Sequence, residues 1–389
     1  MQIVTDTDSL EKRVSAFEKA PYLTVDTEFM RDTSYWPRLC LIQIADPDSA
    51  CIIDPLAEGI DLAPFYRLMT DSPVLKVFHA CRQDIEIVFH ATGKLPTPVF
   101  DTQVAAMVCG FGDSAGYDTL VQKITGRAVD KSSRFTDWAR RPLSDQQLEY
   151  AIGDVTHLRE IYARLSEMLA ANGRESWVRE EMALLTNPET YRLEPETAWK
   201  RIKTRNIKPR PLARLQAVAA WREREAQDKD VPRNRIARDE TLLEIASQPP
   251  GDPSGLSAIR GLSGGFHKSA AGQRLWDALQ AAEALDDDAL PRIAKSGGRP
   301  APTPPMADLL KVLLKIRTQE SDVAARLVAS SADVEAIARG ETDVPALTGW
   351  RKQVFGNDAL ALMRGDLALG ATPGGKIEII ELEPDKEQA

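Results

Sequence analysis

The chain has 389 residues, of which 43% are hydrophobic and 28% charged, and it carries a formal net charge of −9. This length exceeds that of a usual single domain, so we expect two or three folded domains. No apolar stretch approaches the roughly 20 residues that a membrane span requires, and the N-terminus has acids where a signal peptide has basic residues. Both features favour a cytoplasmic protein.

The cysteines and histidines argue against a soft-metal site. The four histidines lack the i, i+4 spacing of a zinc-binding helix, and the four cysteines form no CxxC pair. We therefore expect reduced, mostly buried thiols, and any bound metal would have to be held by carboxylates. The cysteines are Cys40, Cys51, Cys81 and Cys109.

Strand-like and helix-like segments alternate from residue 1 to about 173, which predicts an α/β domain with a mixed sheet and flanking helices. Helices are expected at 84–90 and 145–169. The expected strands are YLTVDTEF at 22–29, LCLIQIAD at 39–46, ACIIDP at 50–55 and VLKVFHA at 74–80.

The first of these strands carries two acids within an otherwise apolar run. Asp26 and Glu28 project from the same face because strand side chains alternate. Two adjacent carboxylates are costly to dehydrate unless a cation lies between them. Two interpretations follow: a cation site, or a solvated strand face.

Two further acids occupy positions that suit a site. Asp84 follows a predicted strand where a helix begins, near the sheet edge that often carries functional groups, although a helix N-cap is an alternative role. Tyr150 and Asp154 lie four residues apart and thus share one face of a predicted helix. The sequence Ser144-Asp145-Gln146-Gln147 is a capping-box pattern that predicts the start of this helix.

Beyond residue 175 the strand signal fades and amphipathic helical patterns take over. The Gly/Pro-rich stretch GGRPAPTPP at 297–305 cannot propagate a helix and divides this half into two all-α modules. We place an α/β domain at 1–173, a helical linker at 174–207, modules at 208–290 and 306–371 separated by a linker at 291–305, and a C-terminal tail at 372–389.

One segment is strongly basic within this acidic chain. Residues 199–238 contain thirteen Lys and Arg residues against four acids. Such a local excess predicts a surface that contacts phosphates.

Taken together, these motifs resemble the DEDD exonuclease superfamily in its tyrosine-containing branch. Tyr150, four residues before Asp154, indicates this branch, since Glu149 stands where the histidine branch carries its base. The resemblance covers about the first 170 residues. It rests on VDTEF at 25–29, FHACRQD at 78–84 and EYAIGD at 149–154, with support from RLCLIQIAD, FDTQVAA and DWARRPLSDQQ.

The helical half resembles HRDC domains, which are small nucleic-acid-binding modules. VPRNRIARDETLLEIA at 231–246 and GLSAIRG at 255–261 carry this likeness, and the last module, ending in TGWRKQVFGNDALALMRGDLAL, is similar to a divergent second copy. The whole arrangement resembles the ribonuclease D family.

The resemblance implies a ribonuclease H-like fold and a 3′–5′ exonuclease that uses two divalent cations, Mg²⁺ or Mn²⁺. It implies that Asp26 bridges the ions, that Glu28 and Asp154 complete the first, and that Asp84 holds the second. Tyr150 would orient the attacking water or help to deprotonate it.

The same resemblance implies that RNA is the partner, in particular tRNA precursors with 3′ extensions, and that nucleoside 5′-monophosphates are released. We expect the chain to act as a monomer. A single-strand DNA exonuclease and a nucleic-acid-binding protein with an inactive nuclease site remain alternatives. The 2′-hydroxyl contacts that separate RNA from DNA are not visible in motif spacing.

Contacts to the nucleic acid are expected from Phe29 and Met30, which flank Glu28, and from Arg82 and Lys131. For Phe29, core packing is an equal alternative, because strand alternation points it away from the acids. His79 and His157 are interpreted as structural.

Overall fold

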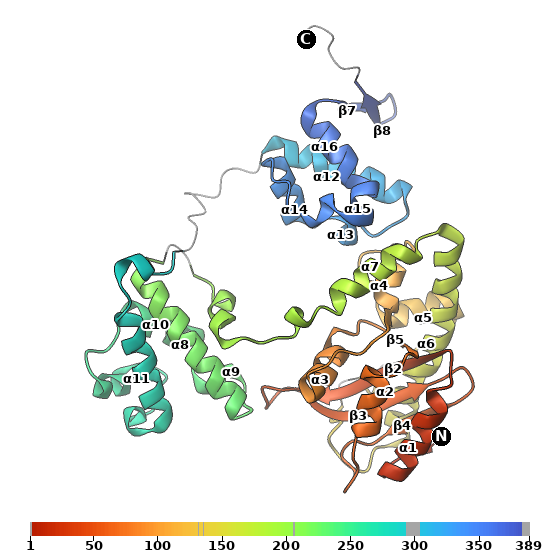
Figure 1. The fold of residues 1–389 in the computed structure, drawn as a ribbon. Coiled ribbons are helices and arrows are strands. Elements are labelled where there is room, and N and C mark those ends of the chain that lie inside the picture. The colour runs from red at the N-terminus through yellow and green to blue at the C-terminus, as the bar shows by residue number, and fades with distance from the viewer. Residues whose placement is uncertain (1, 131, 135, 205–206, 293–303, 383–389) are drawn as a thin grey trace.

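The computed structural model describes residues 2–130, 132–134, 136–204, 207–292 and 304–382, and Figure 1 shows its fold. In its N-terminal region, the described strands form a mixed six-stranded sheet in the order β1-β4-β3-β2-β5-β6. β3 is antiparallel to both of its neighbours, and the other pairs are parallel. The strands are β1 Gln2–Val4, β2 Tyr22–Met30, β3 Arg38–Ala45, β4 Ala50–Ile53, β5 Leu75–Phe78 and β6 Val99–Asp101.

Helices cover both faces of this sheet, as the α/β prediction requires. One face packs against the helices that contribute Leu10, Phe65 and Ile85 to the main apolar core, and α6 covers the other face over β2, β3 and β4 (Figure 1). The helices are α1 Thr7–Phe17, α2 Ala63–Thr70, α3 Arg82–Thr92, α4 Thr102–Val108, α5 Tyr117–Thr125, α6 Asp145–Asn172 and α7 Glu175–Leu185.

Helix α6 begins where the sequence predicts. The Ser144 hydroxyl accepts a hydrogen bond from the backbone N–H of Gln147, whose side chain accepts one from the N–H of Ser144. This capping box satisfies two N–H groups that a helix start leaves without partners. At the other end, Gly173 takes a left-handed conformation (φ +69°), which terminates the helix after 28 residues.

The predicted linker at 174–207 packs against two cores. Val178, Met182 and Tyr191 belong to the core of the N-terminal region, whereas Ala198 and Ile202 belong to the core of the region that follows. Its described residues include α7 and the 3₁₀ turns at Pro188–Thr190 and Pro195–Arg201.

The second region is helical and has its own apolar core. Trp221 is almost fully buried there, and its indole N–H donates to the backbone oxygen of Ala271 at 3.0 Å. The helices are α8 Pro209–Asp228, α9 Arg233–Ile236, α10 Asp239–Ser247 and α11 Ala270–Glu283.

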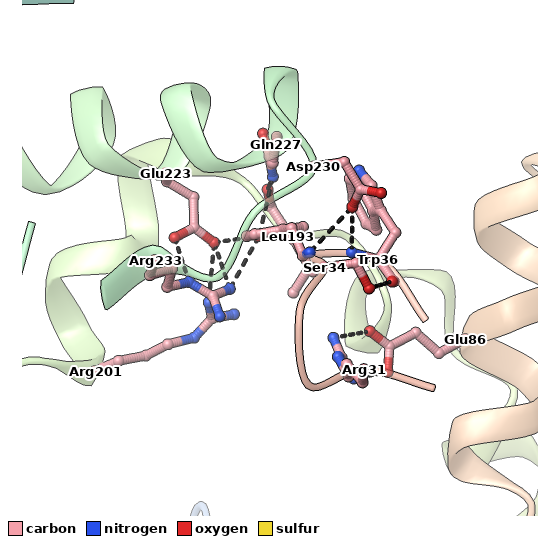
Figure 2. A network of polar contacts seen from close by, with 11 residues as sticks. Arg31, Ser34, Trp36, Glu86, Leu193, Arg201, Glu223, Gln227, Asp230 and Arg233 are labelled. Carbon is pink, nitrogen blue, oxygen red and sulfur yellow. Dashed lines mark hydrogen bonds and ion pairs between the residues drawn. The ribbon is translucent and has the colours of Figure 1, made fainter. Parts of the chain in front are cut away.

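A loop of the N-terminal region, residues 31–37 between β2 and β3, carries the contact with this second region (Figure 2). The carboxylate of Asp230 accepts hydrogen bonds from the backbone N–H groups of Tyr35 at 3.0 Å and Trp36 at 2.9 Å. The Tyr35 hydroxyl donates to Glu223, and the guanidinium of Arg233 lies 4.6 Å from the Tyr35 ring centre. Because Tyr35 is only 3% exposed, this contact is desolvated.

The third region docks on α7 through two stacked tryptophans. The rings of Trp177 and Trp350 lie 4.6 Å apart and nearly parallel. Glu181 of α7 accepts from the Trp350 indole N–H at 2.9 Å and pairs with Arg351 at 2.7 Å. The helices are α12 Pro305–Glu320, α13 Ala325–Val328, α14 Ser331–Ala338, α15 Gly349–Arg351 and α16 Asn357–Arg364.

This third region ends in a β-hairpin of β7 (Leu367–Ala371) and β8 (Ile377–Glu381). The hairpin spans the predicted boundary between the last module and the tail. All four cysteines are buried and free, which agrees with the prediction of reduced thiols. Within the described parts of the chain, no helix combines the length and apolarity needed to cross a bilayer.

Candidate active site

Strand β2 and helix α6 bring three of the predicted acids together. One carboxylate oxygen from each of Asp26, Glu28 and Asp154 lies within 4.8 Å of the other two. Asp26 and Glu28 come from neighbouring positions on one face of β2, and Asp154 comes from α6 above that face. Hard divalent cations prefer such oxygen ligands, so the cluster fits Mg²⁺ or Mn²⁺.

The fourth acid, Asp84, lies beside the cluster on the first turn of α3. Cys81, and not Asp84, is the N-cap residue of this helix. Asp84 is 7% exposed and accepts a hydrogen bond from the Thr27 hydroxyl. Since Thr27 stands between Asp26 and Glu28 in β2, this bond ties α3 to the strand that carries the other acids.

A tight turn between β5 and α3 sets the position of Asp84. Ala80 adopts a left-handed conformation (φ +58°) that is unfavourable for a residue with a side chain. The buried carboxylate of Asp101 accepts from the backbone N–H groups of Ala80 at 3.1 Å and Cys81 at 2.8 Å. It also caps α4 by accepting from the N–H groups of Gln103 and Val104. One carboxylate therefore holds both the strained turn and the next helix.

Two hydroxyl groups fix α6 on the sheet around Asp154. Thr24 of β2 donates to the backbone oxygen of Val155 at 2.8 Å. The partly buried Tyr117 of α5 donates to the backbone oxygens of Asp154 at 2.6 Å and Gly153 at 3.1 Å. Asp154 is thus held through its own backbone and through the residue that follows it.

When no cation is present, the four acids hold their protons more tightly than ordinary carboxyl groups do. Burial, with repulsion from Asp154, Asp84 and Glu28, raises the pKa of Asp26 well above its ordinary value. Burial, with repulsion from Asp154 and Asp84, raises that of Glu28 to about 8. Burial raises the pKa values of Asp84 and Asp154 to about 7. A cation among these groups would relieve both the burial cost and the repulsion.

Tyr150 stands one helical turn before Asp154 and lines the same cavity. Burial, followed by the negative charges of Asp154, Glu28 and Asp26, raises the pKa of its phenol. The hydroxyl therefore stays protonated at neutral pH, where it can donate a hydrogen bond.

The cavity has a volume of about 360 Å³ and is lined by Asp26, Phe29, Asp84, Tyr150 and Asp154, among others. Thr27, which strand alternation places on the same face of β2 as Phe29, lines this cavity too. Phe29 therefore borders the cavity without breaking the expected alternation. The register shift between Glu28 and Phe29 leaves Cys40 of β3 as the extra residue of a bulge.

The other predicted nucleic-acid contacts lie elsewhere. Met30 packs against the small apolar cluster beneath α6. Arg82 is exposed at the start of α3, and Lys131 lies outside the described residues. His79 lines the cavity, with its ring nitrogen 3.0 Å from the Thr102 hydroxyl. His157 lines a separate shallow hollow on α6.

The sequence motifs do not identify several residues that help to form the site. Tyr117 and Arg134 line the cavity, and the positive charge of Arg134 lowers the pKa values of Glu28 and Asp154 against the effect of burial. Thr27 stands inside the DxE motif, and Asp101 within the stretch FDTQVAA, but their partners become visible only in the fold.

The basic segment at 199–238 is less available to phosphates than its charge count predicts. Many of its cations pair with carboxylates of the chain: Arg201 and Arg233 with Glu223, Arg222 with Asp239, Arg224 with Glu196, Lys229 with Glu225, Arg210 with Asp287 and Arg214 with Glu283. Exposed cations of the segment include Lys200, Lys203, Lys208, Arg235 and Arg238.

Comparison with known proteins assigns the family. Residues 1–170 match a model of 3′–5′ exonuclease domains, and residues 212–279 match a model of HRDC domains. The chain is 49% identical to the ribonuclease D of Granulibacter bethesdensis over 382 residues. This alignment covers 97% of this chain and 96% of the relative. The chain belongs to the ribonuclease D family. A ribonuclease D of Gluconacetobacter diazotrophicus is 50% identical over 95% of this chain and 94% of that one.

The solved structure of Escherichia coli RNase D, described as an exoribonuclease involved in structured RNA processing, has the same architecture. It is 31% identical and covers 94% of this chain and 98% of that chain, with a TM-score of 0.81. The prediction of a DEDD exonuclease domain followed by an HRDC domain is confirmed. This member of the ribonuclease D family is a 3′–5′ exoribonuclease, and the family depends on divalent metal.

Proposed function

We propose that this exoribonuclease trims the 3′ ends of structured RNAs, including tRNA precursors with 3′ extensions, and releases nucleoside 5′-monophosphates by two-metal-ion hydrolysis. The observation that supports it best is the meeting of Asp26, Glu28 and Asp154 within 4.8 Å, with Asp84 and Tyr150 in the same cavity. The involvement of the Escherichia coli relative in structured RNA processing supports the choice of structured RNA.

In this proposal Asp26, Glu28 and Asp154 would hold one divalent cation, Mg²⁺ or Mn²⁺, and Asp26 with Asp84 would hold a second. When bound, such a pair would supply activation of water and stabilisation of the leaving 3′-oxygen. The Thr27 hydroxyl and the Asp101 turn hold Asp84 in place. Tyr117 and Thr24 hold the α6 backbone at Asp154 and Val155.

Tyr150 orients the attacking water in this account. Its phenol, kept protonated by burial and by the acids around it, donates a hydrogen bond and accepts another. Phe29 provides an aromatic wall of the cavity, on which a terminal base can stack. Action as a monomer in the cytoplasm completes the proposal.

The test is a gel assay with a 5′-labelled tRNA precursor that carries a 3′ extension, beside a DNA of the same sequence. Each is incubated with Mg²⁺, with Mn²⁺ or with chelator, and the released products are identified by mass. We expect a metal-dependent ladder from the 3′ end of the RNA and nucleoside 5′-monophosphates as products.

Asp26→Asn is the matched control, because it changes one carboxylate to an amide of the same shape. We expect it to abolish hydrolysis and to leave RNA binding largely intact. Full activity of Asp26→Asn would contradict the site, and equal trimming of DNA would contradict the choice of RNA. Binding without cleavage under any metal would instead favour a nucleic-acid-binding protein.

A further inference from the structure

Gln43, at the centre of β3, has a buried side-chain amide without hydrogen-bond partners. Its side chain is 0% exposed, and neither the nitrogen nor the oxygen of its carboxamide has a hydrogen-bond partner in the structure. A buried amide without partners destabilises the folded chain. An apolar side chain of similar size would fill the same space without this cost.

The strand register identifies the polar group that faces it. Gln43 lies opposite Asp26 of β2 on one side and opposite Ile52 of β4 on the other. Opposed residues of an antiparallel pair share a face, with their Cβ atoms about 4.5–5.5 Å apart. On the same face of β3, its neighbours two residues away are the apolar Leu41 and Ala45.

This face is closed by α6. Leu41 and Ile52 pack with Ala151 of α6 in one apolar cluster. Thr24, on the β2 side, directs its hydroxyl to backbone oxygens of Val155 and Ala45. Asp26 is therefore the polar side chain directly across from the Gln43 carboxamide, and its carboxylate is an acceptor where Gln43 offers N–H donors.

We infer that Gln43 is a positioning residue for Asp26, whose ionised carboxylate accepts a hydrogen bond from the Gln43 side-chain N–H when a divalent cation is bound. The inference rests on the proposed cation site. Carboxylates that bind metals are generally held by such hydrogen bonds from neighbouring residues, and loss of one typically weakens metal binding or activity 10- to 100-fold.

The test compares Gln43→Leu with Ile52→Leu, a volume-conserving change on the opposite side of Gln43 from Asp26. Three quantities are measured: Mn²⁺ binding by titration calorimetry without RNA, kcat and KM on a labelled RNA, and the unfolding midpoint. For Gln43→Leu we expect Mn²⁺ affinity and kcat to fall about tenfold or more, with KM little changed. Its midpoint should stay or rise, because the unpaired amide is gone. Ile52→Leu should behave as the wild type does.

If Gln43→Leu kept the Mn²⁺ affinity and the kcat of the wild type, the inference would be overturned. The proposed function would still stand in that case, provided that Asp26→Asn lost both Mn²⁺ binding and activity. Failure of the wild-type chain to bind Mn²⁺ would instead count against the proposed cation site, and the inference would fall with it. If Gln43→Leu does not fold, Gln43→Met keeps the unbranched shape without the N–H donors. Failure of both to fold would also contradict the inference, because it would make the amide a structural requirement.

Discussion

At the scale of single residues, the site consists of carboxylates in positions where burial and mutual repulsion disfavour their charged form. Asp84 and Asp154 are less than a tenth exposed, and their neighbours Asp26 and Glu28 add further negative charge. The fold positions these acids by hydrogen bonds that do not neutralise them, such as the bond from Thr27 to Asp84. This arrangement is unfavourable for the empty protein and favourable for one that holds divalent cations.

A pH dependence of stability follows from the raised pKa values. An acid with a raised folded-state pKa binds its proton more tightly when folded. The stability that it contributes is complete below the unfolded pKa and is lost as pH rises through the folded one. Burial raises the pKa of Glu28 to about 8 and those of Asp84 and Asp154 to about 7, from ordinary values of 4.5 and 3.8. The metal-free protein should therefore lose this stability as the pH rises from about 4 to about 8.5.

Thermal unfolding in chelator across this range measures the effect, and Mn²⁺ should reduce the decline. Asp26→Asn, which removes one of the interacting charges, should show a shallower decline than the wild type. An identical pH dependence of the two proteins would contradict the electrostatic account of the cluster.

Tyr150→Phe tests the role of the phenol, because it removes the hydroxyl and keeps the ring. We expect kcat to fall about 100-fold, within the range of a positioned group that aids proton transfer, with RNA affinity little changed. Steady-state kinetics and a binding titration separate the two. An unchanged kcat would exclude Tyr150 from the water-orienting role, and an equal loss of affinity would indicate a substrate contact.

At the scale of elements, a bulge in β3 and the turn before α3 lie beside the cavity. The register shift between Glu28 and Phe29 leaves Cys40 of β3 as an extra residue opposite the part of β2 that lines the cavity. The turn at Ala80 brings Asp84 to the same cavity, held there by the buried Asp101. Both features are local departures from regular structure at the end of a strand.

Asp101→Ala removes the acceptor for the backbone N–H groups of the turn and of the α4 cap. We expect a loss of about 1–3 kcal/mol in the free energy of unfolding, together with a lower kcat because Asp84 is displaced. Urea unfolding and single-turnover kinetics measure the two effects. Asp6→Ala removes the cap of the surface helix α1 and should reduce stability by about 1 kcal/mol without changing kcat. If both variants kept wild-type kcat, the turn would not position Asp84.

The sequence predicts the regular elements of the site better than these irregular ones. Alternation in 22–29 and the capping box at Ser144 locate β2 and α6 correctly, because both patterns report local geometry. The bulge at Cys40 depends on the pairing of β3 with β2, and the turn residues that Asp101 holds lie about 20 positions before it. The strands β1 and β6, with three residues each, are too short to show an alternation.

At the scale of the whole molecule, both helical regions are fixed to the exonuclease domain by desolvated contacts. Loop 31–37 binds the HRDC domain through Tyr35 and Asp230 (Figure 2), and α7 binds the third region through Trp177 and Glu181. The pattern of helical segments predicts the modules but not these interfaces, because they join residues more than 150 positions apart.

Ion pairs between residues far apart in the sequence explain why a count of charges overestimates the number of cations available to phosphates. Arg210 and Arg214 are neutralised by Asp287 and Glu283, which lie outside the basic segment. A count over a window of sequence includes the cations and omits these partners. The surface that can meet phosphates is therefore smaller than the segment.

Replacing Lys203, Lys208, Arg235 and Arg238 together by alanine tests this smaller surface. We expect weaker RNA binding and a salt dependence that flattens by about 0.7 in the log–log slope for each phosphate that the variant no longer neutralises. Arg224→Ala, which removes a cation already paired with Glu196, is the control and should change neither quantity. An unchanged slope in the fourfold variant would exclude this surface from RNA binding.

The central claim is that Asp26, Glu28, Asp84 and Asp154 hold two divalent cations at one RNA 3′ end. The measurement that tests it most directly is the number of Mn²⁺ ions bound per chain, from electron paramagnetic resonance with an RNA whose terminal linkage resists hydrolysis. We predict two ions for the wild type and fewer for Asp84→Asn and Asp26→Asn. An RNA-bound wild type without Mn²⁺, or an unchanged ion count in Asp26→Asn, would contradict the claim.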